Sequence, residues 1–259
     1  MGININFLND RKNSLLELQA DEKLHGLSKL FIERSAHHLY SYNFDFLGRP
    51  IIQYPQDIVA MQEIIWSIRP DLIIETGIAH GGSLILSATM LALLDMTEAI
   101  ESGIAFDPSV SNRKVLGIDI DIREHNRNAI KSHPMASRIH MIEGSSVELE
   151  VINQVKEIAK DYQTILVCLD SNHTHTHVLA ELEAYGQMTS VGSYCVVFDT
   201  VIEDMPADMF LDRPWGPDNN PKTAVRQYLK THPEFEIDYS IENKLLITVA
   251  PEGYLRRIK

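Results

Sequence analysis

Two aspartates, Asp170 and Asp199, each follow an apolar run of the kind that forms a buried β-strand. One helix is expected between the two runs, so the strands should be parallel and, if they are neighbours, should end roughly 5 Å apart. Two carboxylates this close repel each other unless a cation or a proton lies between them. We therefore predict a divalent cation with oxygen ligands, Mg²⁺, at Asp170 and Asp199, with Thr200 as a further oxygen ligand.

His173 lies three residues after Asp170, and both are predicted catalytic residues. A hydroxyl group that is polarised by a cation near Asp170 needs a base within hydrogen-bond distance, and an imidazole with a pKa near neutrality can serve. We predict that His173 is this base. The alternative is that His173 only caps the helix that follows it.

His175 and His177 alternate with His173 and open a second possibility, a transition-metal or zinc site. His173 and His177 would share a helix face if the helix began early. We expect instead that His175 and His177 are helix-surface residues.

The loop from Glu75 to Ser83 follows an expected strand and opens a helix. Ligands of α/β sheets bind at such turns, and glycines there allow tight backbone turns and close approach of a ligand. The glycine spacing differs from the dinucleotide pattern G-x-G-x-x-G, and Glu75 would repel a phosphate but suits a cationic ligand. His80 could touch that ligand or face water.

This loop resembles the first motif of class I S-adenosylmethionine-dependent methyltransferases, acid-x-Gly-x-x-x-Gly-x-Ser. The match runs through Glu75, Gly77, Gly81 and Ser83. The resemblance implies that S-adenosylmethionine is the cofactor. It also implies that Asp119 accepts hydrogen bonds from the ribose hydroxyls, and that Ser145 and Ser146 lie at the adenine. Asp121 could substitute for Asp119.

The strand-end aspartates resemble the metal site of catechol O-methyltransferases, which carry an acid at the first strand end and an acid-amide pair at the second. Thr200 replaces the amide here. The spacing Asp-x-x-His is similar to that of Mg²⁺-dependent macrolide-sugar O-methyltransferases. That similarity also implies that His173 is the base.

Over residues 57–249 the chain resembles the cephalosporin hydroxylase family, which has a methyltransferase fold. The stretches that carry this resemblance are 75–83, 117–122, 170–177 and 197–204. Phe198 stands where that family has a further acid. The resemblance implies a small acceptor molecule that contains a sugar or glycoside hydroxyl.

The elements that must position these residues alternate from Tyr54 onward, as in a parallel sheet covered on both faces. Strands are expected at 72–75, 115–118, 139–142, 164–169 and 193–198, with helices between them. The runs 235–241 and 245–249 are separated by three residues and should form an antiparallel hairpin. We predict a Rossmann-like α/β methyltransferase fold, with a mainly parallel seven-stranded sheet that ends in this hairpin.

Residues 1–53 should form an N-terminal helical cap or oligomer contact, and residues 54–259 the methyltransferase domain. Segment 203–220 is expected to be a lid over the acceptor, with Trp215 as a platform for sugar stacking. The same composition also fits an ordinary ordered loop. A homo-oligomer is expected.

The composition of the chain, with 259 residues of which 44% are apolar, is enough for one substantial core. A net charge of −13 disfavours a nucleic-acid partner. No apolar run approaches the length of a membrane span and no secretory pattern opens the chain, so a cytoplasmic protein without a membrane partner is expected. The two cysteines should be buried, reduced thiols.

Two other functions fit parts of the pattern. One is an iron- or nicotinamide-dependent hydroxylase component, against which the glycine spacing argues. The other is a non-catalytic protein that binds S-adenosylmethionine as the partner of another enzyme.

Overall fold

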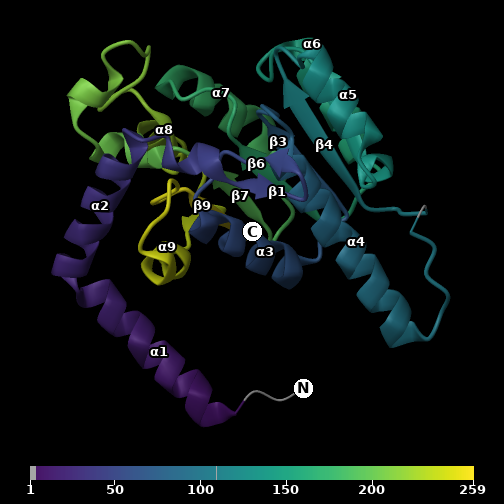
Figure 1. Ribbon diagram of the computed structural model, residues 1–259, viewed down its shortest axis with the longest axis horizontal. Coiled ribbons are helices and arrows are strands. Elements are labelled where there is room, and N and C mark those ends of the chain that lie inside the picture. Colours follow the sequence, from purple (N-terminus) through teal and green to yellow (C-terminus); the bar gives the residue numbers. More distant parts are fainter. Residues whose placement is uncertain (1–3, 109) are drawn as a thin grey trace.

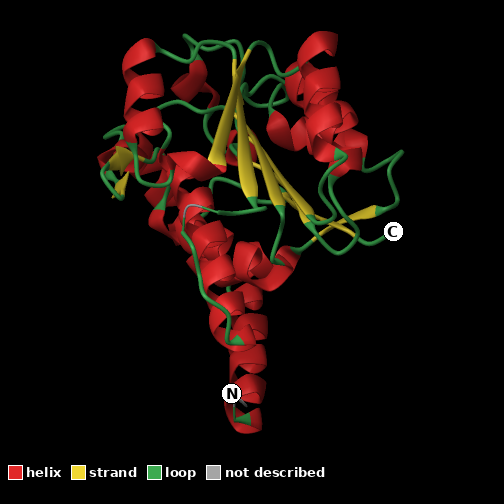
Figure 2. Ribbon diagram, turned by 90° about the vertical axis from the view of Figure 1, so that its right-hand side faces the viewer, coloured by secondary structure: helices red, strands yellow, loops and turns green. Residues whose placement is uncertain are grey.

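The computed structural model describes residues 4–108 and 110–259. Its centre is a seven-stranded sheet with the order β5-β4-β3-β6-β7-β9-β8, in which β5, β4, β3, β6 and β7 run parallel (Figures 1 and 2). The strands are β3 (Leu72–Thr76), β4 (Lys114–Asp119), β5 (Ile139–Glu143), β6 (Ile165–Leu169), β7 (Tyr194–Val197), β8 (Phe235–Ile237) and β9 (Tyr254–Arg257). The predicted fold class is confirmed.

Helices cover both faces of the sheet, as Figure 2 shows. Because side chains alternate along a strand, Ile73 packs toward α3 (Pro55–Ile68) and α4 (Gly82–Ser102), whereas Ile74 packs toward α6 (Leu149–Ala159), α7 (His175–Tyr185) and α8 (Pro221–Tyr228). Helix α5 (Glu124–Ser132) adds Ile130 to the first of these two cores. Cys168 and Cys195 are buried and unpaired, as predicted.

The C-terminal strands are antiparallel, as predicted, but they do not form the predicted hairpin of residues 235–241 and 245–249, because α9 lies between β8 and β9. Strand β9 pairs antiparallel with both β7 and β8, whereas residues of the predicted second run, 245–249, form no strand. Helix α9 (Tyr239–Leu245) begins where Asp238 accepts a hydrogen bond from Ser240 N. Asp57 binds Val249 N and Thr248, so this apolar run is held by a side chain of α3 instead of a strand ladder.

Helix α4 corrects a second expectation. Within the described residues it is the one helix that could cross a membrane by length and composition, with a mean hydropathy of 1.5 over its best window. Half of that window is buried, and helices in the core of a globular domain pass the same test. Ten of its residues are buried in contact with the rest of the domain.

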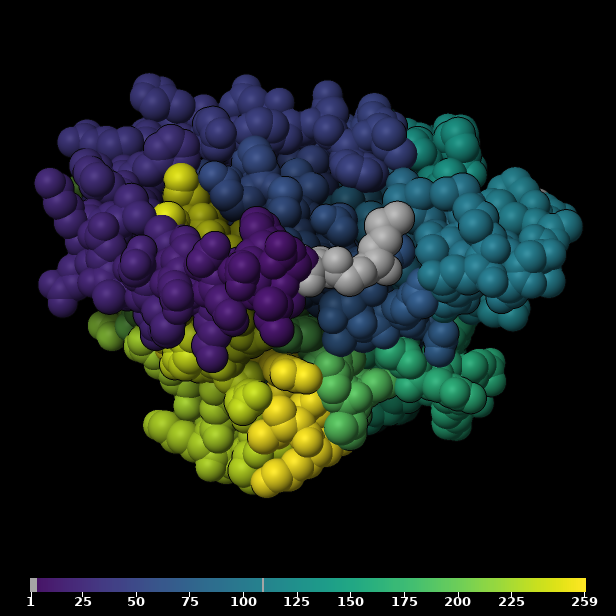
Figure 3. All heavy atoms as spheres, turned by 90° about the horizontal axis from the view of Figure 1, so that it is seen from below, coloured from purple at the N-terminus to yellow at the C-terminus, as the bar shows by residue number. Residues whose placement is uncertain are grey.

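The N-terminal helices α1 (Ile5–Ala20) and α2 (Glu22–Ala36) form an arm that extends from the body in two views (Figures 1 and 2). Seen from below, the arm lies across the molecule beside C-terminal residues (Figure 3). A small hairpin of β1 (Asp45–Phe46) and β2 (Arg49–Pro50) then leads into α3.

Candidate active site

Asp170 and Asp199 follow the neighbouring strands β6 and β7, which pair in parallel through Leu169 and Val197. Their carboxylates come together with His173, and one possible ligand atom from each of the three residues lies within 4.8 Å of the others. His173 Nε2 is 3.2 Å from Asp199 Oδ2. The structure therefore brings together the three residues to which the sequence assigned the chemistry.

The charges in this cluster favour a bound cation. Burial raises the pKa of Asp170 well above its ordinary value, and the neighbouring charge of Asp199 raises it further. A divalent cation between the two carboxylates would remove this repulsion, and carboxylate oxygens are the ligands that Mg²⁺ prefers. The donor set thus fits Mg²⁺.

Thr200 does not reach the cluster. Asp199 adopts a left-handed backbone conformation with φ 55°, and the Thr200 side chain that follows is buried, with its hydroxyl donating to Pro251 O at 2.6 Å. The predicted ligand role of Thr200 has no support in this geometry, because its buried hydroxyl is engaged with Pro251 O, whereas His173 lies beside Asp199.

His173 is not a helix cap. The N-cap of α7 is Thr174, whose N and Oγ1 donate hydrogen bonds to Asn172 Oδ1 in the turn before the helix. The ring of His173 instead lies edge-on to Trp215, with centroids 4.8 Å apart.

The two other histidines have partners of their own, contrary to the expectation that they lie on the helix surface. His175 contacts Thr223 and Gln227 of α8 at 2.7 and 3.0 Å. His177 Nε2 lies 3.1 Å from Ser146 Oγ and 3.2 Å from Ser171 Oγ. A zinc site that joins His173 and His177 is therefore not formed among the described residues.

The glycine loop lies directly against Asp170 of the cluster of Asp170, His173 and Asp199. Gly77 has φ 90°, and a Cβ there would stand 2.1 Å from Asp170 O, so no larger residue fits. Gly81, with φ 85°, lies against Ile130 in the same way. Asp119 Oδ2 accepts hydrogen bonds from Ile78 N and Ala79 N at 2.7 and 3.2 Å, which holds the loop at the end of β4.

Glu75 lies beneath the loop instead of within it. Its buried carboxylate accepts a hydrogen bond from Ser87 Oγ at 2.5 Å, and burial raises its pKa, whereas hydrogen bonds from Ser87 and Ser83 oppose that shift. We infer that Glu75 supports the loop from the core side.

The two serines after β5 differ in burial, since Ser145 is only half-buried. Ser146 is buried beside His177, and the Ser145 carbonyl accepts from Glu148 N at 3.0 Å. Asp121, the alternative to Asp119, lines the same surface hollow as Asp119.

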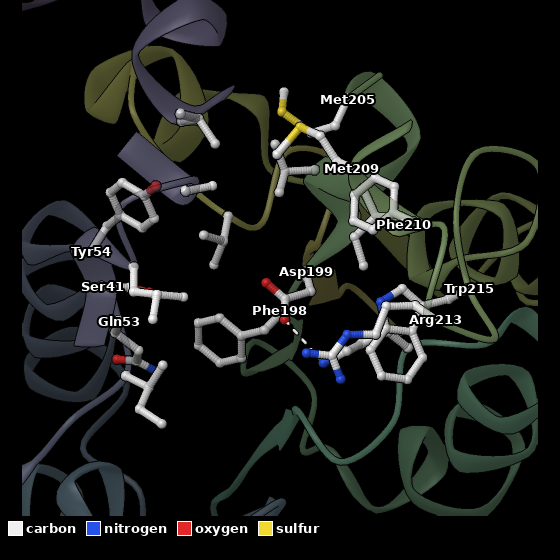
Figure 4. A pocket seen from close by; sticks show the side chains of 18 of the residues that line it. Ser41, Gln53, Tyr54, Phe198, Asp199, Met205, Met209, Phe210, Arg213 and Trp215 are labelled. Atoms are coloured by element: carbon white, nitrogen blue, oxygen red, sulfur yellow. Dashed lines mark ion pairs between the residues drawn. The ribbon is translucent and has the colours of Figure 1, made fainter. Parts of the chain in front are cut away.

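Two cavities meet at Asp170. The smaller one, of about 150 Å³, is lined by the glycine loop, including Gly77 and Ser83, and by Asp119. The larger one, of about 460 Å³, is lined by Asp199 and His173, and Figure 4 shows Asp199 in its wall. Ile52, Gln53 and Asp170 line both cavities.

Sequence reasoning missed the segment from Arg49 to Gln53. Arg49 donates to His80 O and Asn126 Oδ1, and so braces the loop from outside. Gly48 and Pro50 indicate a turn, but no pattern in the sequence indicates that Ile52 and Gln53 line both cavities.

Comparison with known proteins identifies the family. The family described as rhamnosyl O-methyltransferase/CmcI matches residues 38–258. A rhamnosyl O-methyltransferase of Mycobacterium bovis (strain BCG / Pasteur 1173P2) is 30% identical over 206 residues, which cover 78% of this chain and 73% of that protein. One from Mycobacterium leprae (strain TN) is 28% identical over 233 residues, covering 87% and 90%.

Solved structures show the same fold. A CmcI structure whose description names Mg-SAM has a TM-score of 0.55 at 17% identity. The match covers 84% of this chain and 78% of that chain. A second CmcI structure, whose description names SAH, has a TM-score of 0.54 at 18% identity. The match covers 83% of this chain and 83% of that chain. The resemblance to this family, predicted from the loop and the strand-end acids, is confirmed: the chain belongs to the rhamnosyl O-methyltransferase/CmcI family.

Proposed function

We propose that this protein is an S-adenosylmethionine-dependent O-methyltransferase that modifies a hydroxyl of a sugar-containing small molecule and uses Mg²⁺. The observation that carries the proposal is the meeting of two cavities at Asp170, one under the glycine loop and one over Asp199. A methyl donor in the first and an acceptor in the second would have their reacting atoms side by side.

The cofactor supplies the methyl group, and Mg²⁺ supplies the positive charge that makes an acceptor hydroxyl more acidic. Asp170 and Asp199 would hold the ion and so fix the position of the hydroxyl. His173 would accept the hydroxyl proton at Nε2, the nitrogen that faces Asp199. Much of the rate would come from holding the two reactants in line.

The relatives are named for methyl transfer to a rhamnosyl group. We therefore propose a rhamnose or a related sugar as the acceptor. Trp215, which lines the larger cavity beside His173, is suited to pack against the apolar face of a sugar ring.

The test combines binding and turnover. Calorimetry should show binding of S-adenosylmethionine and none of NADPH, and methyl transfer to rhamnosides should require Mg²⁺ and be lost with EDTA. Binding of NADPH alone would favour the hydroxylase alternative and contradict the proposal. Methyl transfer that persists in EDTA would contradict the metal part only.

A further inference from the structure

The loop from Glu75 to Ser83, here called the donor loop, holds one alanine in a backbone conformation that alanine seldom adopts. Ala79 has φ 45°, in the left-handed region that favours glycine, whereas the other positive φ angles of the loop belong to Gly77 and Gly81. Ala79 is exposed and lines the smaller cavity. A residue other than glycine keeps this conformation only where its surroundings hold it. The contacts that hold Ala79 are therefore part of how the donor loop is built.

The backbone of Ala79 is held on both sides by side chains. Ala79 N donates to Asp119 Oδ2 at 3.2 Å, and Ala79 O accepts from Asn126 Nδ2 at 3.0 Å. Asn126 is only 4% exposed, so water does not readily replace it as the donor to Ala79 O. Without the amide of Asn126, the backbone of Ala79 would be free to return to a negative φ.

Arg49 holds Asn126 and the next residue of the donor loop at the same time. Its Nη2 donates to Asn126 Oδ1 at 2.9 Å, and its Nε donates to His80 O, also at 2.9 Å. The planar guanidinium can make both contacts at once, which a lysine ammonium on its flexible chain cannot do in the same geometry. The Asn126 amide fits only one way round, with its oxygen to the guanidinium and its nitrogen to the carbonyl. We call Arg49 and Asn126 the loop brace.

The two elements that carry the loop brace are also fixed to each other. Arg49 lies on β2 and Asn126 on α5. His133, directly after α5, has its Nε2 3.1 Å from Leu47 O in the turn of the small hairpin. The same hairpin lies close against α4, because a Cβ on Gly82 would stand 2.3 Å from Pro50 O. The loop brace therefore has a defined position relative to the donor loop.

We propose that Arg49 and Asn126 are positioning residues for the methyl donor, which hold Ala79 left-handed and so keep the donor loop in the form that binds S-adenosylmethionine. This inference rests on the proposed function and deepens it. Asn126 lines the surface hollow beside Asp119, whereas Arg49 lines neither that hollow nor the smaller cavity. An effect of Arg49 on donor binding must therefore pass through the loop.

The physical reason is the cost of ordering the loop. A loop that is already in its binding form gives up little conformational freedom when the ligand arrives. Without the loop brace, donor binding would have to restore the strained conformation of Ala79, and affinity would fall by that amount. Once the donor is bound, its methyl group would lie where it lies in the unaltered protein. The change should therefore appear in KM for the donor and not in kcat.

The first measurements are the Kd of S-adenosylmethionine by calorimetry, and its KM and kcat with a rhamnoside acceptor. Asn126→Ala should raise Kd and KM about tenfold, as expected for a lost hydrogen bond at a buried group, and leave kcat within about twofold. Arg49→Lys keeps the positive charge but not the two contacts, and should raise Kd about threefold or more. Asn128→Ala, an exposed asparagine of the same helix, should change nothing.

Ala79→Gly separates positioning of the loop from a general loss of stability. Glycine adopts the left-handed conformation at little cost, so Asn126→Ala combined with Ala79→Gly should bind the donor within about threefold of the unaltered protein. A brace that served only to stabilise the fold would not be replaced in this way, since glycine makes the loop more flexible. Melting temperatures of all variants show whether stability and donor affinity change together.

Several outcomes would overturn the inference. They are an unchanged donor Kd in both Asn126→Ala and Arg49→Lys, a loss of affinity that Ala79→Gly does not restore, and a kcat that falls as much as KM rises. If the donor Kd values follow the expected pattern but no rhamnoside is methylated, the proposed function fails and the inference stands. If the unaltered protein does not bind S-adenosylmethionine, both fail.

Discussion

His173 is the residue whose position makes the sharpest prediction about chemistry, because its Nε2 faces the carboxylate of Asp199 at 3.2 Å. Replacing it with alanine should lower kcat by about two to four orders of magnitude, since general base catalysis is worth that much. Affinity for S-adenosylmethionine should not change, and kcat should recover in part at higher pH as hydroxide replaces the base.

The matched control is His125→Ala, an exposed histidine of α5, which should leave kcat unchanged. The measurement is a pH profile of kcat together with calorimetric cofactor binding. A His173→Ala protein with undiminished turnover would remove the base from the mechanism. If Asp170→Ala also left turnover undiminished, the measured methyl transfer would not take place at the cluster of Asp170, His173 and Asp199.

Single residues were predictable from the sequence where a strand end determines their position. Asp170 and Asp199 were found because the carboxyl ends of adjacent parallel strands meet. Thr200 could not be placed, because the positive φ at Asp199 turns the chain and only the structure shows it. The inward position of the Glu75 side chain could not be predicted either. It depends on a hydrogen bond from Ser87 in α4, and the sequence does not show how that helix packs on the sheet.

At the scale of elements, Asp57 joins α3 to the segment that leads into β9. Its buried carboxylate accepts hydrogen bonds from Thr248, Val249 N and Tyr254, and burial raises its pKa to about 6 from 3.8. The folded protein therefore binds this proton more tightly than the unfolded chain. Its contribution to the free energy of unfolding is greatest below about pH 4 and is lost as the pH rises through about 6.

The corresponding prediction concerns Asp57→Asn. The variant should lose this pH dependence, which amounts to about 3 kcal/mol for a shift of two pKa units. Urea unfolding of both proteins at about pH 4 and about pH 7 measures the difference. Parallel pH dependence in the two proteins would show that Asp57 is not the titrating group.

Elements with a long, regular pattern were predicted closely. The strand expected at 115–118 lies within β4, and the strand expected at 164–169 is β6. The short apolar run 245–249 was misassigned, because an apolar run of that length fits a buried strand, a helix end or a buried loop equally well. What decides is the buried Asp57, which supplies the partner that a neighbouring strand would otherwise provide.

At the scale of the whole molecule, helix α1 is largely exposed to solvent. None of its residues is buried, and Ile5, Phe7, Leu8 and Leu16 are all exposed. We expect copies of the chain to associate through this helix, because apolar side chains that stay exposed to water favour association. The division of the chain at residue 53 stays a prediction.

Sedimentation velocity should show a species heavier than the 29.4 kDa monomer. The double substitution Phe7→Asp and Leu16→Asp should shift it to the monomer, whereas Glu17→Gln on the same helix should not. A monomeric unaltered protein at micromolar concentration would contradict the expected homo-oligomer.

The contact between Gly77 and Asp170 couples the proposed methyl-donor site to the proposed ion site. Asp170 N donates to Thr76 O at 2.9 Å, and Gly77 leaves no space between the loop and the Asp170 backbone. A ligand that shifts the loop would therefore also shift Asp170, one of the two carboxylates that we propose hold the ion. Thermodynamic linkage then makes the effect reciprocal: whatever factor the methyl donor contributes to ion affinity, the ion returns to donor affinity.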